Sequence, residues 1–313
     1  MGNARSIKLN GRAYDVCGKL GSGGFSEVYL VQARGSKARY ALKVMECQED
    51  EQLQRALMEI QLHRRIAHAN VLPLVASEIR MKSHVQHSDV ENALTKSKEV
   101  LLLFPVFPRG SLQDILNDAA AQKGPAYSQD ACIRIFEGIV NGVLEIHQAG
   151  LAHRDIKPAN VLLTEDDIPV VMDFGSVAPL HICISSHHDA VAMAETAAQF
   201  SSGAYRAPEL YDECFRGELS AAADVWSLGC LLYAMAFGPF GPFESAVEGI
   251  KVLAIRTGTV RFPKSPVYSP GFCMLIQDML QVEPEARPTL TNVLQRLRTV
   301  RRPIAPSLTP HSC

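Results

Sequence analysis

One eight-residue segment in the middle of the chain restricts its chemistry more than any other: His153-Arg154-Asp155-Ile156-Lys157-Pro158-Ala159-Asn160. Eighteen positions after Asp155, the sequence continues with Asp173-Phe174-Gly175. Asp155 could accept the proton of an attacking hydroxyl group, and Lys157 could neutralise charge on a migrating phosphoryl group. Asn160 and Asp173 carry oxygen ligands of the kind that Mg²⁺ prefers. Helix caps or turns would explain either acid alone, but the whole arrangement predicts a phosphoryl-transfer site.

Residues that could hold a nucleotide lie upstream, in the order that such a site requires. A glycine-rich turn between two apolar runs reads Gly21-Ser22-Gly23-Gly24-Phe25-Ser26-Glu27-Val28. Lys43, in Tyr40-Ala41-Leu42-Lys43, could bind the α- and β-phosphates, and Glu59 on an expected helix could pair with it. A flexible turn, a snorkelling lysine or a solvated glutamate would be the usual interpretation of each feature alone. Their order and spacing favour a functional set.

Together these motifs resemble those of the eukaryotic protein kinases, and the likeness extends over about residues 14–300. Ala207-Pro208-Glu209, Asp224-Val225-Trp226-Ser227-Leu228-Gly229 and Arg287 belong to the same pattern. The resemblance implies an α+β, bilobal fold, with a small five-stranded β lobe carrying one main helix and a larger, mostly α-helical lobe. It implies that Glu209 and Arg287 form a buried structural ion pair. It also implies ATP as cofactor, Mg²⁺ or alternatively Mn²⁺ as metal, and protein substrates.

The segment Leu101–Gly110 resembles the hinge between the two lobes, with Phe104 at the gatekeeper position. Pro105 could offer its carbonyl to adenine, and the N–H of Phe107 would supply the donor. The expected nucleotide-binding residues are Gly21, Ser22, Gly23, Gly24, Phe25, Ser26, Val28, Ala41, Lys43, Phe104, Pro105 and Phe107. The expected catalytic residues are Asp155, Lys157, Lys43 and Glu59, and the expected metal ligands are Asn160 and Asp173.

Smaller features narrow the resemblance to one branch of the kinases. Lys157, two residues after the base, and Ser202, ahead of Tyr205-Arg206-Ala207-Pro208-Glu209, favour serine/threonine over tyrosine as the acceptor. Ser26 in place of a third glycine, Met172-Asp173-Phe174-Gly175-Ser176, and Ala197-Ala198-Gln199 are similar to the Numb-associated kinase family. We therefore expect an active kinase that transfers the γ-phosphoryl group of ATP to protein Ser/Thr hydroxyls.

The segment from Asp173 to Glu209 is long, and its stretch Ala190–Ala198 could form an extra helix. Arg154 beside the base is the arrangement that lets a phosphate order this segment. We expect autophosphorylation there, and the alternative is order supplied by the extra helix. The candidate acceptors are Ser185, Ser186, Thr196, Ser201 and Ser202.

The first six residues, Met1-Gly2-Asn3-Ala4-Arg5-Ser6, fit the pattern for myristoylation of Gly2. One acyl chain binds a membrane only marginally, and Arg5, Lys8 and Arg12 could add attraction to anionic lipids. Cys17, the nearest cysteine, is expected to face the folded lobe and would be a poor site for a second chain. We expect a cytoplasmic protein that partly associates with Golgi, endosomal or vacuolar membranes, as the family resemblance implies.

Composition sets aside several other classes of protein. The net charge of −2 does not indicate the basic surface that binds nucleic acid. The eight cysteines lack the spacing of disulfide-bonded or metal-binding cysteines. The longest apolar stretch, Leu228–Phe240, is too short to span a membrane, and no secretory signal is present. A kinase-fold scaffold normally lacks one of Lys43, Asp155 or Asp173, and a Walker or Rossmann enzyme would need motifs that are missing here. The oligomeric state stays open.

The expected domain division is an N-terminal lipidation segment (1–13), a kinase domain (14–300) and a disordered tail (301–313). Within the domain, the small lobe would cover 14–104, the hinge 105–110 and the large lobe 111–300. Alternation of apolar residues predicts three strands within 14–45, and further strands at 71–76 and 100–104 around a polar loop at 81–98. Helices are expected at 51–66, 129–147 and 222–237.

Overall fold

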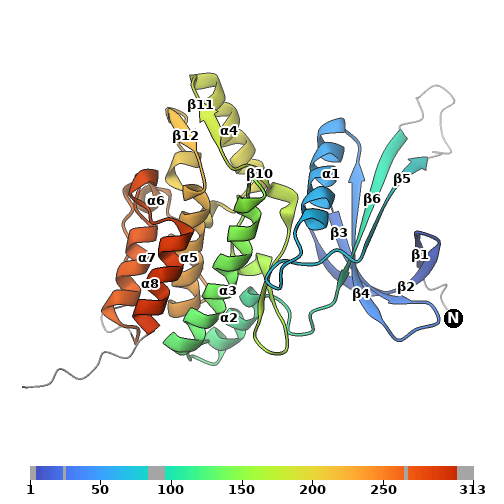
Figure 1. The fold of residues 1–313 in the computed structure, drawn as a ribbon, viewed down its shortest axis with the longest axis horizontal. Coiled ribbons are helices and arrows are strands. Elements are labelled where there is room, and N and C mark those ends of the chain that lie inside the picture. Colours follow the sequence, from blue (N-terminus) through green and yellow to red (C-terminus); the bar gives the residue numbers. More distant parts are fainter. Residues whose placement is uncertain (1–4, 24–25, 84–95, 264–266, 302–313) are drawn as a thin grey trace, which may run out of the picture.

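An antiparallel sheet with one long helix against it forms the N-terminal lobe (Figure 1). The structure, a computed structural model, describes residues 5–23, 26–83, 96–263 and 267–301. The six strands have the order β1-β2-β3-β4-β6-β5. Their bounds are Ser6–Leu9 (β1), Arg12–Ser22 (β2), Ser26–Ala33 (β3), Arg39–Cys47 (β4), Ala76–Ser83 (β5) and Lys96–Pro105 (β6). The helix α1, Asp50–Arg65, begins with a capping box between Glu49 and Gln52.

The predicted bilobal α+β fold is confirmed, but the sheet has six strands where we expected five. The additional strand is β1, which lies inside the expected lipidation segment and buries Ile7 and Leu9. The strand expected at 71–76 is wrong, because β5 begins at Ala76 and continues into the region expected to be a loop. The polar residues of β5 gave no strand pattern in the sequence. The edge strand tolerates the charge of Arg80 because Arg80 forms an ion pair with Glu99 on the neighbouring strand.

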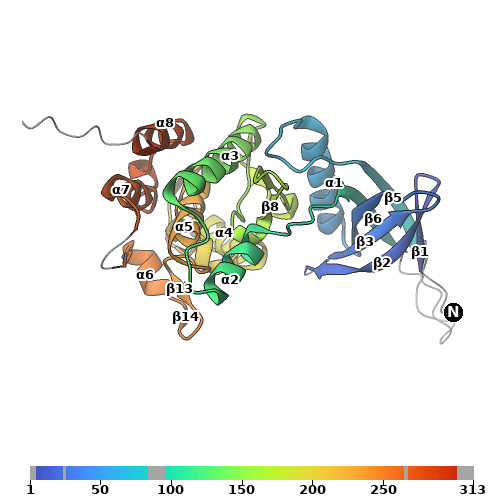
Figure 2. The same ribbon diagram turned by 90° about the horizontal axis from the view of Figure 1, so that it is seen from below.

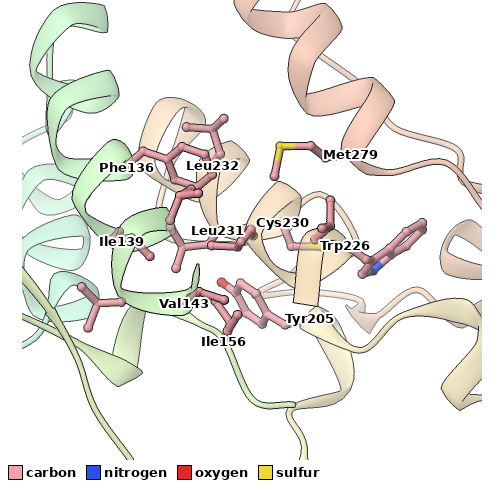
Figure 3. Close-up of a cluster of buried hydrophobic side chains, with 14 of the residues drawn as sticks. Phe136, Ile139, Val143, Ile156, Tyr205, Trp226, Cys230, Leu231, Leu232 and Met279 are labelled. Atoms are coloured by element: carbon pink, nitrogen blue, oxygen red, sulfur yellow. The ribbon is translucent and has the colours of Figure 1, made fainter. Parts of the chain in front are cut away.

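Helices dominate the C-terminal lobe (Figure 2). They are α2 (Leu112–Ala121), α3 (Gln129–Gln148), α4 (His187–Phe200), α5 (Ala222–Phe237), α6 (Val252–Thr257), α7 (Pro270–Met279) and α8 (Leu290–Arg301). The helix α5 agrees with its predicted bounds, and α3 extends one residue past them. Figure 3 shows the core that these helices share, where Leu232 of α5 lies beside Phe136 of α3 and Cys230 of α5 lies near Met279 of α7. This core fixes α3, which leads directly into the catalytic segment.

The large lobe also contains short strands, which form antiparallel pairs. They are β7 (Leu151–Ala152), β8 (Val161–Leu163), β9 (Pro169–Val171), β10 (Ala178–Pro179), β11 (Ile182–Ile184), β12 (Gly217–Leu219), β13 (Glu244–Ser245) and β14 (Gly249–Ile250). β7 pairs with β10 and β8 with β9, so the residues after each strand are brought together. The extra helix expected at 190–198 is present as the longer α4. The tail expected from residue 301 lies outside the described residues, except for Arg301 at the end of α8.

Candidate active site

Lys43 joins the small lobe to the catalytic segment of the large lobe. Its Nζ atom lies 2.9 Å from Oε1 of Glu59 and 3.0 Å from Oδ1 of Asp173. Lys43 comes from the central strand β4, and Glu59 comes from the face of α1 that packs on the sheet. The helix therefore stands close to the sheet, in the position that allows the expected pair to form.

Lys43 and Asp173 keep each other ionised, whereas burial raises the pKa of Glu59. Burial would lower the pKa of Lys43, but the carboxylates of Glu59 and Asp173 outweigh it and raise that pKa. The ammonium group of Lys43 in turn lowers the pKa of Asp173 to about 2. At neutral pH, the site thus presents a cation for phosphate and an ionised carboxylate for a metal.

The residues of the catalytic loop converge on Asp155. Lys157 Nζ donates to Oδ2 of Asp155 and to Oγ of Ser202, both over 2.7 Å. The backbone N–H of Ser202 donates to Oδ1 of Asp155 over 2.8 Å. Asn160 holds the loop closed, because its Nδ2 donates to the carbonyl oxygen of Asp155 over 2.7 Å and to Oδ2 over 2.9 Å. These bonds leave the side-chain oxygen of Asn160 available as a ligand.

Asp224, a fully buried residue of α5, supports the catalytic loop from below. Its carboxylate accepts the backbone N–H groups of His153 and Arg154, over 2.8 Å and 2.9 Å, and lies 2.8 Å from Nε2 of His147. Burial would raise the pKa of Asp224, but the bond to His147 and the positive charge of nearby groups such as Arg154 together outweigh burial and hold that pKa well below its usual range. Sequence reasoning placed Asp224 in a motif without giving it this role. The sequence feature that could have indicated this role is a single acidic residue in the first turn of a strongly apolar helix.

His63 is a second residue whose position sequence reasoning missed. It lies one helical turn after Glu59 on α1, and its ring centre is 4.6 Å from that of Phe174 and 5.0 Å from that of Phe104. Its Nδ1–H donates to the carbonyl oxygen of Leu72 over 2.8 Å. Burial lowers the pKa of His63 to about 4, so the ring is neutral under ordinary conditions. The imidazole thus packs between the expected gatekeeper and the Asp-Phe-Gly segment.

The expected nucleotide-binding residues lie on one side of the cleft. Val28 is opposite Lys43 in the β3–β4 pair, and Ala41 is opposite Phe104 in the β4–β6 pair. Phe107, from the hinge, packs with Ala41 and Phe104 in one apolar cluster. Gly21 and Ser22 end β2, Ser26 begins β3, and Gly23 follows β2 with its N–H donating to the carbonyl oxygen of Ser26; Pro105 ends β6. Gly24 and Phe25, at the tip of the turn, lie outside the described residues.

Leu162 of β8 was not predicted as a site residue, yet it completes this apolar cluster from the opposite lobe. A cavity of about 550 Å³ adjoins the cluster at the catalytic end of the cleft. Gly23 and Lys43 line it from the small lobe, and Asp155, Lys157 and Asp173 line it from the large lobe. Asp155, the two lysines and Asp173 therefore face one space of a size suited to the phosphates of a nucleotide and an acceptor group.

Glu209 and Arg287 form the expected ion pair away from this space. Arg287 donates from Nη1 and Nη2 to the two carboxylate oxygens of Glu209, over 2.7 Å and 2.8 Å. Both side chains are buried, and Arg287 also donates to the carbonyl oxygen of Gln281. The geometry assigns this pair to the scaffold of the large lobe.

The N-terminal expectations meet the structure only in part. Gly2 lies outside the described residues. Cys17 is exposed at a β-bulge between Val16 and Gly18, so the expectation that it faces the lobe is wrong. The extra residue of a bulge does not follow the alternation of the strand, which is why the sequence pattern misled. No helix among the described ranges is long and apolar enough to cross a membrane.

This two-lobed arrangement, with a Lys–Glu–Asp bridge across a cleft, defines a protein kinase. The model of the family described as "Protein kinase domain" matches residues 14–297, and the chain belongs to this family. Serine/threonine-protein kinase 16 of Homo sapiens is 34% identical over 95% of this chain and 93% of its own length. The Mus musculus protein of that name is 33% identical with the same coverage. Serine/threonine-protein kinase ENV7 of Saccharomyces cerevisiae is 29% identical over 94% of both chains.

The predicted kinase family and the serine/threonine class are therefore confirmed. The chain has the enzymatic class of an ATP-dependent serine/threonine protein kinase, which acts on proteins and uses a divalent metal.

Proposed function

We propose that the chain transfers the γ-phosphoryl group of ATP to Ser/Thr hydroxyls with Asp155 as the catalytic base. Asp155 orients the acceptor hydroxyl and takes its proton, while Lys157 faces the transferred group. Lys43 binds the α- and β-phosphates, and Glu59 keeps Lys43 in place. The adenine ring lies between Ala41 and the hinge, and the hinge carbonyl of Pro105 and N–H of Phe107 bind its edge.

Asn160 and Asp173 are the proposed metal ligands, and their chemistry fits Mg²⁺, with Mn²⁺ as an alternative. Mg²⁺ is commonly held by one or two protein oxygens together with substrate phosphates. The pKa of Asp173 is held at about 2, so this carboxylate is ionised. Asn160 uses its amide N–H₂ on Asp155 and keeps its oxygen free. The bound metal would neutralise charge on the β- and γ-phosphates.

The observation that carries the proposal is the group of bonds among Asp155, Lys157 and Ser202. Through these bonds the carboxylate of Asp155 and the ammonium group of Lys157 lie together at the cavity, and both are attached to Ser202. The test is phosphate transfer from labelled ATP to myelin basic protein by wild type and Asp155→Asn. Asp155→Asn should lose transfer by about 100-fold or more while its ATP binding and unfolding temperature stay near those of wild type. Equal activity of the two proteins would refute the role of Asp155.

The long segment between Asp173 and Glu209 is proposed as a regulatory element. The Nε, Nη1 and Nη2 atoms of Arg154 are buried and have no hydrogen-bond partner among the described residues. A buried guanidinium without a partner can donate several hydrogen bonds to a phosphate group. Among the candidate hydroxyls, that of Thr196 is on the exposed face of α4. We propose that autophosphorylation within this segment supplies the phosphate.

Order without phosphate is the alternative, and one contact favours it. The guanidinium carbon of Arg55 on α1 lies 3.7 Å above the centre of the Phe200 ring at the end of α4. Protein made in bacteria, treated with phosphatase and examined by mass spectrometry separates the two ideas. Phosphorylation should reappear between residues 173 and 209 on incubation with ATP, and activity should rise with it. Full activity without phosphate in this segment would refute the switch.

Membrane association through a myristoylated Gly2 is the remaining part of the proposal. It is supported by the N-terminal pattern and by the exposed positions of Lys8 and Arg12. By family resemblance, the membrane would be that of the Golgi, an endosome or a vacuole, reached from the cytoplasm. The proposed domain division is a lipidation segment at 1–13, whose strand β1 packs on the small lobe, a kinase domain at 14–300 and a tail at 301–313.

A further inference from the structure

The strand β1 is part of the sheet that carries the glycine-rich turn. Ile7 and Leu9 are buried in the same apolar cluster as Leu42, a neighbour of Lys43. β1 pairs with β2 over its whole length, and the carbonyl oxygen of Arg5 accepts the backbone N–H of Val16 over 2.9 Å. The chain is thus tied into the small lobe from residue 5 onward.

The far end of β1 is tied to the opposite edge of the sheet. The backbone N–H of Asn10 donates to the carboxylate of Glu78 on β5. Nη1 of Arg80, also on β5, donates to the carbonyl oxygen of Lys8 over 3.2 Å. β1, labelled in Figure 1, therefore closes the curled sheet between β2 and β5.

A chain of polar contacts runs from Arg5 to the base of the glycine-rich turn. Nη1 of Arg5 donates to the hydroxyl of Tyr29 over 3.3 Å, and its guanidinium carbon lies 5.1 Å from the centre of the Tyr29 ring. The same hydroxyl donates to Oε2 of Glu27 over 2.5 Å. Oε1 of Glu27 is 2.7 Å from Nζ of Lys19. Lys19 is on β2 and Glu27 on β3, so this ion pair joins the two strands just below the turn.

We propose that Arg5 is a positioning residue for ATP binding, acting through Tyr29 and Glu27 on the strands that flank the glycine-rich turn. Strands that are already held in one geometry lose less conformational freedom when phosphates bind at their ends. Arg5 itself contacts neither the cavity nor the catalytic loop. The inference rests on the proposed ATP site, and it adds the N-terminal strand to the parts that determine nucleotide affinity.

The test measures KM for ATP and kcat separately, on purified protein without lipid. Arg5→Ala should raise KM for ATP about two- to fivefold, the size expected from one partly exposed cation–π contact and its hydrogen bond, with kcat at saturating ATP retained. Tyr29→Phe keeps the ring and removes the hydroxyl, and it should raise KM in the same direction. Lys8→Ala removes the same charge from an exposed position on β1, three residues after Arg5, and its KM should equal that of wild type.

An Arg5→Ala enzyme with the wild-type KM would overturn the inference, and so would an equal rise in Arg5→Ala and Lys8→Ala, which would indicate net charge alone. If Arg5→Ala lowers the unfolding temperature, Tyr29→Phe decides, because it leaves β1 and its buried side chains unchanged. A wild-type protein that transfers no phosphate would instead refute the proposed function, so the two failures are distinguishable.

Discussion

The backbone N–H of Ser202 is bonded to the carboxylate of Asp155 over 2.8 Å, although 47 positions separate the two residues. The segment that faces the protein substrate is therefore attached to the proposed base itself. Lys157 strengthens the attachment by donating to both residues. A change in the long segment before Ser202 can thus reach the base through a single residue.

Replacing Ser202 with Ala should lower kcat about tenfold, because Lys157 loses a charge-assisted hydrogen bond that fixes its ammonium group. Ser202→Thr keeps the hydroxyl and should retain most of the activity. Steady-state phosphorylation of myelin basic protein by the three enzymes checks this. If the Ala and Thr variants fall equally, the hydroxyl has no such role.

Asp173 offers a test of the metal site in which the choice of substitution matters. Its backbone has a φ of 64°, in the left-handed region that Asn adopts more easily than Ala. Asp173→Asn should therefore remove the carboxylate with little strain and reduce transfer with Mg²⁺ about 100-fold or more. Asp173→Ala should be equally inactive but also less stable. Full activity of Asp173→Asn with Mg²⁺ would contradict the assignment of Asp173 as a metal ligand.

Lys43→Ala should lose activity through lost phosphate positioning.

His63 predicts a pH dependence of stability. The pKa of a free histidine is near 6.5, but burial lowers that of His63 to about 4. Between these values the unfolded chain takes up a proton that the folded chain does not, so the free energy of unfolding falls as the pH falls from about 6.5 to about 4. The loss from this one residue should approach about 3 kcal/mol at the acid end.

The measurement for His63 is urea unfolding of wild type and His63→Leu at several pH values. Leu fills a similar apolar space and cannot be protonated, so the variant should show a shallower dependence in the same window. Other histidines contribute equally to both proteins and cancel in the comparison. Parallel curves for the two proteins would show that His63 is not the group responsible.

The ion pair of Glu209 and Arg287 should act on stability and not on chemistry. Removing one partner leaves the other charged and buried, which costs about 3–5 kcal/mol. Arg287→Ala should therefore unfold at a much lower urea concentration, while any folded fraction keeps its KM for ATP. A stable but inactive Arg287→Ala protein would indicate a catalytic role instead.

The sequence predicted those parts of the fold that follow from local spacing. The helix α5 could be placed because Ala222–Phe237 is apolar and bounded by Gly238, and the catalytic residues could be grouped because their motifs keep a fixed order. The strand β5 could not be placed from the sequence. Its charged residue Arg80 is paired with Glu99 on the neighbouring strand β6, and this contact joins residues 19 positions apart.

The same distinction holds within the site. The pairing of Lys43 with Glu59 was predicted from a helix position, whereas the support that Asp224 gives to residues 153 and 154 depends on how α5 packs under the catalytic loop. The exposure of Cys17 depends on a bulge, which no alternation pattern reveals. Contacts set by tertiary packing were thus the part that the sequence left open.

The last prediction concerns location. A single myristoyl chain on Gly2 should bind membranes weakly, so the kinase should divide between membrane and soluble fractions and Gly2→Ala should become soluble. Lys8 and Arg12 are exposed and should each add about 1 kcal/mol of attraction to anionic lipid, whereas Arg5 is engaged by Tyr29.

Salt separates these contributions, because surface attraction is screened within about 10 Å near 0.1 M ionic strength. Raising the salt concentration should release much of the membrane-bound pool. Binding that resists salt would instead indicate a second acyl chain, for which the exposed Cys17 is the nearest cysteine. Wild type, Gly2→Ala and Cys17→Ser are therefore to be fractionated side by side at low and high salt. An unchanged membrane share in Gly2→Ala would refute the lipid anchor, and a loss confined to high salt in Cys17→Ser would show that both chains are needed.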